Sequence, residues 1–514
     1  MKTFITLSFL VILGLHKAEN AKILAVLPLP TVSHFVMFSS LLEELASRGH
    51  EVDVITPLKN AQEVPGLNVI PIQMPDIYKK FKHFKLETLR GLSATSFVKM
   101  IFVDHLNLCE ICFAPDAMKK IRDGGPKYDL IILEIFVTDC LFGFAHALQA
   151  PVISVTTSID LPWGSSRMGN PDNPSYIANY FANVVPKMTL LERLHNMITL
   201  VQTKMTHWWF LQQQEKEAKK FFGEDLPPLN KLVANSSLFL INSHFSSNQA
   251  RPTVKNVIEI AGVHIKEPKT LEKVYSDFIG NSSFIYFSLG SWTSSETIPI
   301  HKLQSIFDVL KELKFKVIWK SDKKKLSNEL IIPKNIFITE WVPQLDILCH
   351  PNILFFITHN GLMSTQEAIH CGVPMISIPA FSDQFINAKT MVQKGVALEL
   401  KIETATKQDI HHILQEMIEN RKYKENAMKL SQQFKDRPQK PLDEAIYWVE
   451  YVLRHKGAPQ LKSDSIYLEW YQYHLLDVLF IILSFIVIFL GILYIIIRRC
   501  IHLLFGRTHK QKLL

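Results

Sequence analysis

Residues 353–378, ILFFITHNGLMSTQEAIHCGVPMISI, decide the fold. The run at 353–357 is short and continuously apolar, which is typical of a strand buried on both faces of a parallel sheet. Residues 362–370 combine apolar positions with good helix formers, and 373–378 form a second apolar run. The stretch therefore predicts a strand–turn–helix–strand unit of an open parallel sheet. Ligands bind such sheets at the carboxyl ends of the strands, where residues 358–361 lie.

The turn at residues 358–361 is suited to a phosphate. Gly361 lets the backbone come close to a ligand. The helix that follows offers free N–H groups and the positive end of its dipole. Ser364 and Glu367 are three residues apart, so they share one face of that helix. These features predict a site for an anion.

A longer ordered pattern surrounds this turn and resembles the signature of the UDP-glycosyltransferases, the GT-B family that moves sugars from UDP-sugars to small lipophilic acceptors. The residues that carry the resemblance share one spacing over residues 341–384: Trp341, Gln344, His359, Gly361, Ser364, Glu367, Asp383 and Gln384. The resemblance implies two Rossmann-like domains facing a cleft. It also implies that Trp341 stacks on uracil and that Gln344 bonds the ribose or base.

The same resemblance implies roles along the rest of the donor. His359 and Ser364 would hold the diphosphate, and Glu367 would take the ribose hydroxyls. Asp383 and Gln384 would grip the hydroxyls of the sugar. Any one of these residues alone is more often core, cap or solvated helix face, so the interpretation depends on the whole ordered set.

Two further positions belong to this half. Ser291 follows an expected strand at 283–289, and the resemblance puts it beside the diphosphate, although a plain strand-end turn has the same appearance. Asn360 departs from the family, whose members often have Gly or Cys there. Because Asn tolerates unusual backbone angles, we expect the turn to form.

The N-terminal half begins with a βαβ pattern: a strand at 22–27, a helix at 35–47 and a strand at 51–56. His34 lies on the first strand-to-helix loop. The resemblance makes it the general base that removes the proton of the acceptor hydroxyl, which suits an imidazole that titrates near working pH. A helix-capping or buried histidine is the alternative.

A histidine base usually needs a carboxylate to orient it. Glu134 ends the next buried strand, at 128–133, and Asp139 follows on the turn into a helix. The sequence does not choose between them. We favour Asp139, because relatives often have Asp in this role; either could instead be a helix N-terminal charge with no catalytic part.

The regions 57–125 and 156–230 are the least regular in this half. Aromatic and apolar residues recur in them, and this composition suits an apolar acceptor pocket. Cys109 and Cys112 could suggest a redox pair or half a metal site, but we interpret them as apolar positions of a helix. Six cysteines in 514 residues do not predict a disulfide framework.

The composition excludes several classes of function. The net charge of +8 is mild and no basic stripe interleaves with aromatics, so no nucleic acid is expected as a partner. The chain has no G-x-G-x-x-G, which argues against a nicotinamide or flavin enzyme. It has no Asp-x-Asp, so we expect neither a metal clamp nor any cofactor besides the UDP-sugar.

The two ends of the chain predict a membrane protein. Lys2 and the apolar run at 4–15 are typical of a secretory signal peptide. Residues 478–497 carry no charge and are long enough to span a bilayer, and the basic tail after them predicts a cytosolic C-terminus. The last five residues resemble a dilysine retrieval signal of the endoplasmic reticulum. Asn235 and Asn281 begin glycosylation sequons, as expected of a lumenal body.

The domains expected from these features run in chain order: 1–20 signal peptide, 21–250 acceptor-binding Rossmann-like domain, 251–460 UDP-sugar-binding Rossmann-like domain, 461–477 juxtamembrane segment, 478–497 transmembrane helix and 498–514 cytosolic tail. The predicted reaction is the inverting transfer of a hexosyl group from a UDP-sugar to a small lipophilic acceptor. Glucose is favoured, since no Arg or Lys of the 381–390 segment is well placed for the carboxylate of glucuronic acid. The alternatives are a glucuronic acid donor, or a membrane-anchored binder without catalysis. Membrane lipid and a homo- or hetero-oligomer are possible partners.

Overall fold

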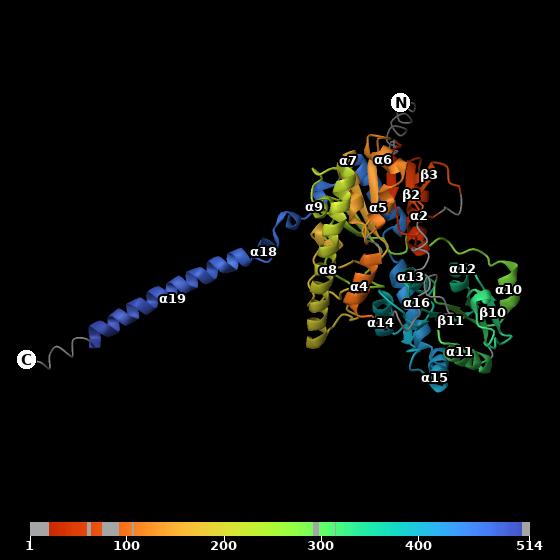
Figure 1. Cartoon of the computed structure of the whole chain (residues 1–514). Coiled ribbons are helices and arrows are strands. Elements are labelled where there is room, and N and C mark those ends of the chain that lie inside the picture. Colours follow the sequence, from red (N-terminus) through yellow and green to blue (C-terminus); the bar gives the residue numbers. More distant parts are fainter. Residues whose placement is uncertain are drawn as a thin grey trace, which may run out of the picture. The chain divides into compact units, whose positions relative to one another are not determined.

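The computed structural model describes residues 20–58, 63–73, 92–104, 107–290, 298–313 and 315–505. The chain divides into two compact units, Met1–Lys462 and Ser463–Leu514. The first unit contains two parallel sheets and their covering helices (Figure 1). The predicted signal peptide and dilysine tail lie outside the described residues.

The N-terminal sheet has seven parallel strands in the order β3-β2-β1-β4-β5-β6-β7. They are β1 (Lys22–Val26), β2 (Glu51–Thr56), β3 (Leu67–Pro71), β4 (Leu130–Glu134), β5 (Val152–Thr156), β6 (Leu238–Ile241) and β7 (Val257–Glu259). The central strands β1 and β4 are buried on both faces, as their continuous apolar runs predict. Because β1 and β4 are neighbours in register, the loops at their carboxyl ends meet.

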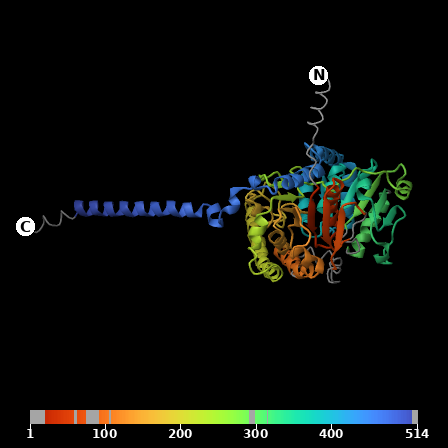
Figure 2. The same ribbon diagram turned by 90° about the horizontal axis from the view of Figure 1, so that it is seen from above.

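The helices of this half cover both faces of its sheet. They are α2 (Val32–Ser47), α4 (Ala94–Asp104), α5 (Leu108–Phe113), α6 (Asp116–Arg122), η2 (Asp139–Phe142), α7 (Gly143–Leu148), η3 (Ser165–Met168), α8 (Leu190–Phe222) and α9 (Leu229–Ala234). In both views α8, the long yellow helix, runs along one side of this unit (Figure 1, Figure 2). It packs against α4, and the Thr95 hydroxyl of α4 donates to Gln202 Oε1 of α8 at 2.9 Å.

The C-terminal sheet has six parallel strands in the order β10-β9-β8-β11-β12-β13. They are β8 (Phe284–Ser288), β9 (Lys316–Lys320), β10 (Ile336–Thr339), β11 (Ile353–Thr358), β12 (Met375–Ser377) and β13 (Ala397–Glu399). The sheet is covered by α10 (Lys273–Ile279), α11 (Ile300–Glu312), η5 (Lys323–Lys325), α12 (Gln344–Leu348), α13 (Leu362–His370), α14 (Gln384–Gln393), α15 (Lys407–Glu419) and α16 (Lys422–Lys435). The predicted unit of residues 353–378 is confirmed as β11, α13 and β12.

The chain then returns to the first domain through α17 (Pro441–His455) and η6 (Pro459–Leu461). Ala445, Ile446, Val449 and Val452 of α17 are fully buried in the core that α2 shares with the first sheet. The first domain is therefore completed by α17, which lies near the end of the unit in sequence. The first sheet also passes the expected boundary at residue 250, since β7 pairs with β6.

Residues 156–230, which we expected to be among the least regular of this half, contain its longest described helix. Within this region α8 extends for 33 residues and begins with a capping box, in which Thr189 and Glu192 satisfy each other's backbone N–H groups. Its apolar residues do not form an inward stripe, so the usual sign of an amphipathic core helix is missing.

The second unit contains η7 (Asp464–Tyr467), α18 (Trp470–Tyr473) and α19 (Leu476–Phe505). Residues Leu476–Leu503 are long and apolar enough to cross a membrane: an 18-residue window of this helix has a mean hydropathy of 3.2, and none of that window is buried. This helix contains the predicted span at 478–497. Figure 1 draws it in blue.

Candidate active site

A cleft of about 500 Å³ lies between the carboxyl edges of the two sheets. That volume is within the range of about 300–1,000 Å³ that is usual for small-molecule sites. The segments that line it lie at the carboxyl ends of β1, β4 and β5 of the first domain and of β8, β9, β10, β11 and β12 of the second, and α4 adds a further part of the wall. Two doubly wound sheets thus present their ligand-binding edges to one cavity.

His34 and Glu134 meet on the N-terminal wall. His34 is in the first turn of α2, and Glu134 is the last residue of β4, the neighbour of β1. Nδ1 of His34 is 2.6 Å from Oε1 of Glu134, and the Thr157 hydroxyl donates to the same oxygen at 3.3 Å. The Glu134 side chain is 1% exposed and that of His34 is 18% exposed. The contact occupies Nδ1, so Nε2 is the ring nitrogen that remains for a further hydrogen bond.

Asp139 is not part of this pair, and our preference for it was wrong. Its carboxylate accepts from Arg167 Nη1 at 2.6 Å and lies 3.0 Å from His207 Nε2 of α8. Burial alone would raise the pKa of Asp139, but the Arg167 charge and the His207 hydrogen bond hold that pKa well below its usual range. Asp139 is therefore a structural anion that joins η2 and η3 to α8.

On the opposite wall, Gln344 connects two of the predicted donor residues. Its Nε2 donates to Ser364 Oγ at 3.0 Å and to Glu367 Oε2 at 2.6 Å. Its Oε1 accepts from the hydroxyl of Tyr286 at 3.1 Å. Burial raises the pKa of Glu367 to about 7, although the Gln344 hydrogen bond and the Lys320 charge partly oppose the rise. The carboxyl group is thus near its protonation midpoint at neutral pH.

His359 lies on the same wall, in the turn between β11 and α13. A Cβ at Gly290 or Gly361 would lie 2.6 or 2.5 Å from His359 Nε2, so the imidazole fills the space that both glycines leave open. Its buried Nδ1 has no hydrogen-bond partner among the described residues. Asn360 has a φ of 60°, which confirms that the turn tolerates Asn. Burial, with a further contribution from Lys320, lowers the pKa of His359 to about 4.

Lys320 was missed in the sequence. It is the last residue of β9, and its Nζ lies 5.4 Å from the centre of the Trp341 ring. Trp341 is 69% exposed, so a face of its indole remains open to a flat ligand. Among the described residues that line the cleft, Lys320 is the one Lys or Arg. Its position at a strand's carboxyl end was the signal that could have identified it.

Asp383 and Gln384 form the corner of the cleft where α14 begins. Asp383 Oδ2 accepts from Asn387 Nδ2 at 2.9 Å, and burial raises the pKa of Asp383 to about 6. Gln384 Oε1 accepts from the backbone N–H of Ala380 at 2.8 Å. Across the cleft, the hydroxyl of Tyr180 lies 3.3 Å from Ser382 Oγ, which joins the two walls beside this corner.

The family model for UDP-glucoronosyl and UDP-glucosyl transferase matches residues 21–512. The chain belongs to the UDP-glycosyltransferase family. UDP-glucosyltransferase 2 of Dactylopius coccus is 36% identical over 502 residues, which are 96% of each chain. UDP-glucuronosyltransferase 2B17 of Mus musculus is 33% identical over 480 residues, which are 88% of each chain. The protein is thus an enzyme that transfers sugar from a UDP-sugar to an acceptor.

Solved structures agree on the fold of this UDP-glycosyltransferase. The calicheamicin glycosyltransferase CalG4 superposes with a TM-score of 0.59 at 14% identity, covering 85% of this chain and 99% of its own. UGT2 of Phytolacca americana, solved with UDP-2fluoro-glucose and pterostilbene, gives 0.55 at 15% identity, covering 84% and 99%. The predicted GT-B architecture of two Rossmann-like domains and one C-terminal apolar helix is confirmed.

Nine of the twelve catalytic and donor residues predicted for this UDP-glycosyltransferase line one cleft, and Glu134 joins them through its contact with His34. Asp139 lies apart from them. The residues that line the cleft are His34, Trp341, Gln344, His359, Gly361, Ser364, Glu367, Asp383 and Gln384. Ser291 lies outside the described residues. Asn235 and Asn281, which begin the sequons, are both exposed.

Four cysteines of the UDP-glycosyltransferase are paired. Cys109 bonds to Cys140, and Cys349 bonds to Cys371. Cys112 remains a buried free thiol, so Cys109 and Cys112 are not a redox pair. Our expectation of unpaired apolar cysteines is therefore corrected for Cys109. Its partner follows β4, at a distance of 31 residues that no local motif reveals.

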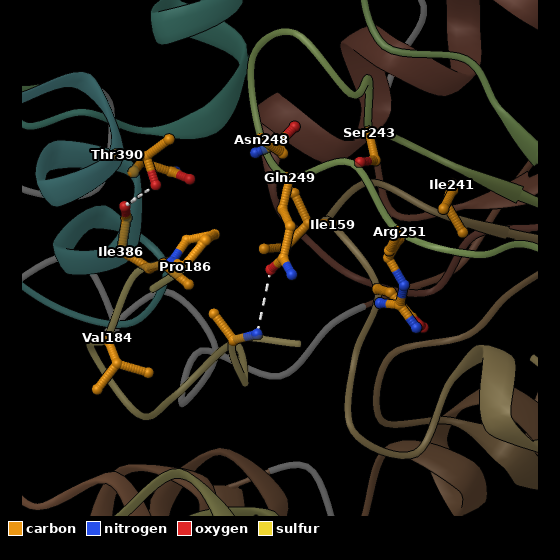
Figure 3. A pocket seen from close by; sticks show the side chains of 13 residues that line it. Ile159, Val184, Pro186, Ile241, Ser243, Asn248, Gln249, Arg251, Ile386 and Thr390 are labelled. Carbon is orange, nitrogen blue, oxygen red and sulfur yellow. Dashed lines mark hydrogen bonds and ion pairs between the residues drawn. The ribbon is translucent and has the colours of Figure 1, made fainter. Parts of the chain in front are cut away.

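A second hollow of the enzyme lies between the first domain and α14, near the corner of the cleft where α14 begins (Figure 3). Its volume is about 40 Å³, which is room for a few waters at about 10–15 Å³ each but not for a substrate. Gln249 lines this hollow, and its Oε1 accepts a hydrogen bond from the backbone N–H of Ala178 at 3.1 Å. Figure 3 shows Ile386 and Thr390 of α14 on the opposite side. The larger cleft is the candidate active site.

Proposed function

We propose that this enzyme inverts the anomeric centre of a hexose as it transfers the sugar from UDP to a hydroxyl of a small lipophilic acceptor. The observation that carries the proposal is the pairing of His34 with Glu134 across the cleft from the donor residues. Nε2 of His34 takes the hydroxyl proton while the acceptor oxygen attacks the anomeric carbon. The bond from that carbon to the UDP oxygen breaks, and UDP keeps the electron pair. A single displacement from the opposite side inverts the centre.

Glu134 stabilises the imidazolium that forms on His34 and keeps Nδ1 occupied. This pairing makes Glu134, rather than Asp139, the proposed positioning residue.

On the donor side, Trp341 is proposed to stack on uracil, and Gln344 and Glu367 to bind the ribose. His359 and Ser364, at the amino end of α13, are proposed to hold the diphosphate, and Ser291 to lie beside it. The charge that develops on UDP would be stabilised by the helix end and by Lys320. With these groups we propose that the reaction needs no metal, so that activity persists in a chelator.

The proposed sugar is glucose. Asp383 and Gln384 are proposed to hold its hydroxyls, and the carboxylate of glucuronic acid would need a cation near them. Lys389 is not placed to serve, because its Nζ donates to the carbonyl oxygen of Asn183 at 2.7 Å. Lys320 stands at the other end, beside Trp341. A competition assay in which UDP-glucuronic acid outcompetes UDP-glucose would overturn this assignment.

The acceptor is proposed to be apolar. Around His34 the first domain lines the cleft with Val36, Phe97, Met100 and Phe136. A flat lipophilic alcohol or phenol would bury its body against these side chains and present its hydroxyl to the imidazole. Detoxification of such compounds is the role that this chemistry suits.

We further propose a single-pass location in the membrane of the endoplasmic reticulum, with the catalytic body in the lumen. The apolar helix α19 supports an anchor. Two disulfides and two exposed sequons at Asn235 and Asn281 support an oxidising, glycosylating compartment. Loss of mass after endoglycosidase treatment, abolished in Asn235→Gln/Asn281→Gln, would test the orientation.

The deciding experiment measures transfer from labelled UDP-glucose and UDP-glucuronic acid to a phenol panel in membranes that contain the protein. The variant is His34→Ala, and the matched control is His301→Ala, an exposed histidine on α11 away from the cleft. Transfer that collapses only in His34→Ala supports the mechanism. UDP binding with no transfer from either donor would favour a non-catalytic binder. Unchanged transfer in His34→Ala would exclude His34 as the base.

A further inference from the structure

The first five turns of α8 have the opposite polarity from a normal surface helix. Their buried face is polar: Asn196, Thr199, Thr203 and His207 point into the body. Asn196 Nδ2 donates to the carbonyl oxygens of Pro174 and Ile177 at 2.8 and 2.7 Å. The interior therefore does not explain why the helix carries so many apolar residues.

The apolar residues are on the outside. Nine large side chains with exposed fractions between 43% and 76% lie along residues 190–209: Leu190, Leu191, Leu194, Met197, Ile198, Val201, Met205, Trp208 and Trp209. At about 100° per residue they occupy one sector, about a third of the helix circumference. No polar residue of 190–209 falls in that sector. We call these nine residues the outer stripe.

We propose that the outer stripe docks on the lipid bilayer surface, so that the catalytic body has a membrane contact of its own. The inference rests on the proposed anchoring by α19. Residues 463–475 join α19 to the body, so an anchored chain holds the body near lipid at high effective concentration. An apolar face on one side of a helix is what burial at a headgroup boundary requires.

Three features favour lipid over a second copy of the chain. The outer stripe is wider than the narrow seam of a two-helix coiled coil, and three of the six positions that would flank such a seam are apolar: Leu190, Met197 and Trp209. Trp is typical of membrane interfaces. Arg193 and Lys204 border the stripe on one side, where anionic headgroups would lie, while Glu192 is on the far side of the helix.

These charged groups have partners that leave the stripe itself free of acid. Lys204 pairs with Asp172, Arg193 donates to the carbonyl oxygen of Met188 at 3.1 Å, and Glu192 is held in the capping box. The apolar surface of the outer stripe is therefore the contribution that carries the docking.

The test uses the full chain, one copy per nanodisc, in phosphatidylcholine with brominated acyl chains, which quench nearby tryptophan. The fluorescence of Trp208 and Trp209 is obtained as the difference between the wild-type protein and the Trp208→Phe/Trp209→Phe variant. Trp470→Phe supplies a positive control beside α19, and Trp341→Phe a negative control, since Trp341 is exposed in the cleft. We expect the Trp208 and Trp209 signal to lose intensity to an extent comparable with that of Trp470.

Quenching of both signals in single-copy discs supports docking. Quenching of Trp470 alone would overturn it while leaving the anchor intact, and quenching of neither would refute the anchor and with it the inference. A second variant, Leu194→Gln/Ile198→Gln/Met205→Gln, should reduce the loss at Trp208 and Trp209. If a crosslinker placed at Met205 instead joins two copies, and single-copy discs show no quenching, the outer stripe is a protein interface.

Discussion

Replacing Glu134 with Gln tests the central pair of the proposed mechanism. The substitution keeps the size of the side chain but removes the charge that lies 2.6 Å from His34 Nδ1. Two unit charges about 4 Å apart interact with about 4 kcal/mol at an effective dielectric constant of about 20. His34 is 18% exposed, so we discount this to about 3 kcal/mol. At about 1.4 kcal/mol per tenfold, the expected loss in kcat is roughly a hundredfold.

The assay is steady-state transfer to a phenolic acceptor at varied UDP-sugar concentration. We expect kcat to fall while the donor KM stays unchanged, because Glu134 lies on the acceptor wall. Asp139→Asn is the matched control: it breaks a buried ion pair with Arg167, so the melting temperature should drop, by the equivalent of about 3–5 kcal/mol, while kcat of the folded enzyme is kept. Full activity in Glu134→Gln, or a loss of kcat in a stably folded Asp139→Asn, would refute the assignment.

Three other results are expected. Burial raises the pKa of Glu367 from 4.5 to about 7, so the stability that it contributes is complete below its unfolded pKa and is lost as pH rises through about 7. The melting temperature of the UDP-free enzyme should therefore fall between about pH 5 and about pH 8, and Glu367→Gln should flatten that dependence; an unchanged slope would contradict the cause. Lys320→Met should raise the donor KM and lower kcat by roughly tenfold or more, measured beside Lys389→Met, which should have little effect; equal losses would contradict a special role for Lys320. Cys109→Ser/Cys140→Ser should lower the free energy of unfolding in urea by about 3–4 kcal/mol, since the bond closes a loop of 31 residues, and an unaltered midpoint would show that the bond adds no stability.

The sequence predicts the C-terminal domain well because its signals are local. Residues 353–378 contain two apolar strands and a helix within 26 positions, and each element obeys its own period. His359 directly follows β11, so naming that strand also located this residue. Gly361 could also be identified from the sequence, because glycine permits a close approach of the backbone to a ligand.

The features that were missed depend on contacts between distant segments. Glu134 and Asp139 are five residues apart, and only the packing of η3 and α8 against Asp139 decides which carboxylate is free for His34. The pairing of Cys109 with Cys140 is equally non-local. α8 was missed for a different reason: pattern analysis assumes that apolar faces point inward, and here the body supplies polar partners to the inner face.

The contact between α8 and α4 links the outer stripe to the cleft. α4 packs on α8 with one face, while its Phe97 and Met100 line the cleft. If α8 rests on a bilayer, the pocket wall is one helix away from the phase in which lipophilic compounds dissolve. The acceptor concentration that the enzyme meets would then be its mole fraction in lipid rather than its molarity in water. Apparent KM values would rise as more lipid is added at a fixed amount of acceptor, and the most hydrophobic compounds would show the largest dilution.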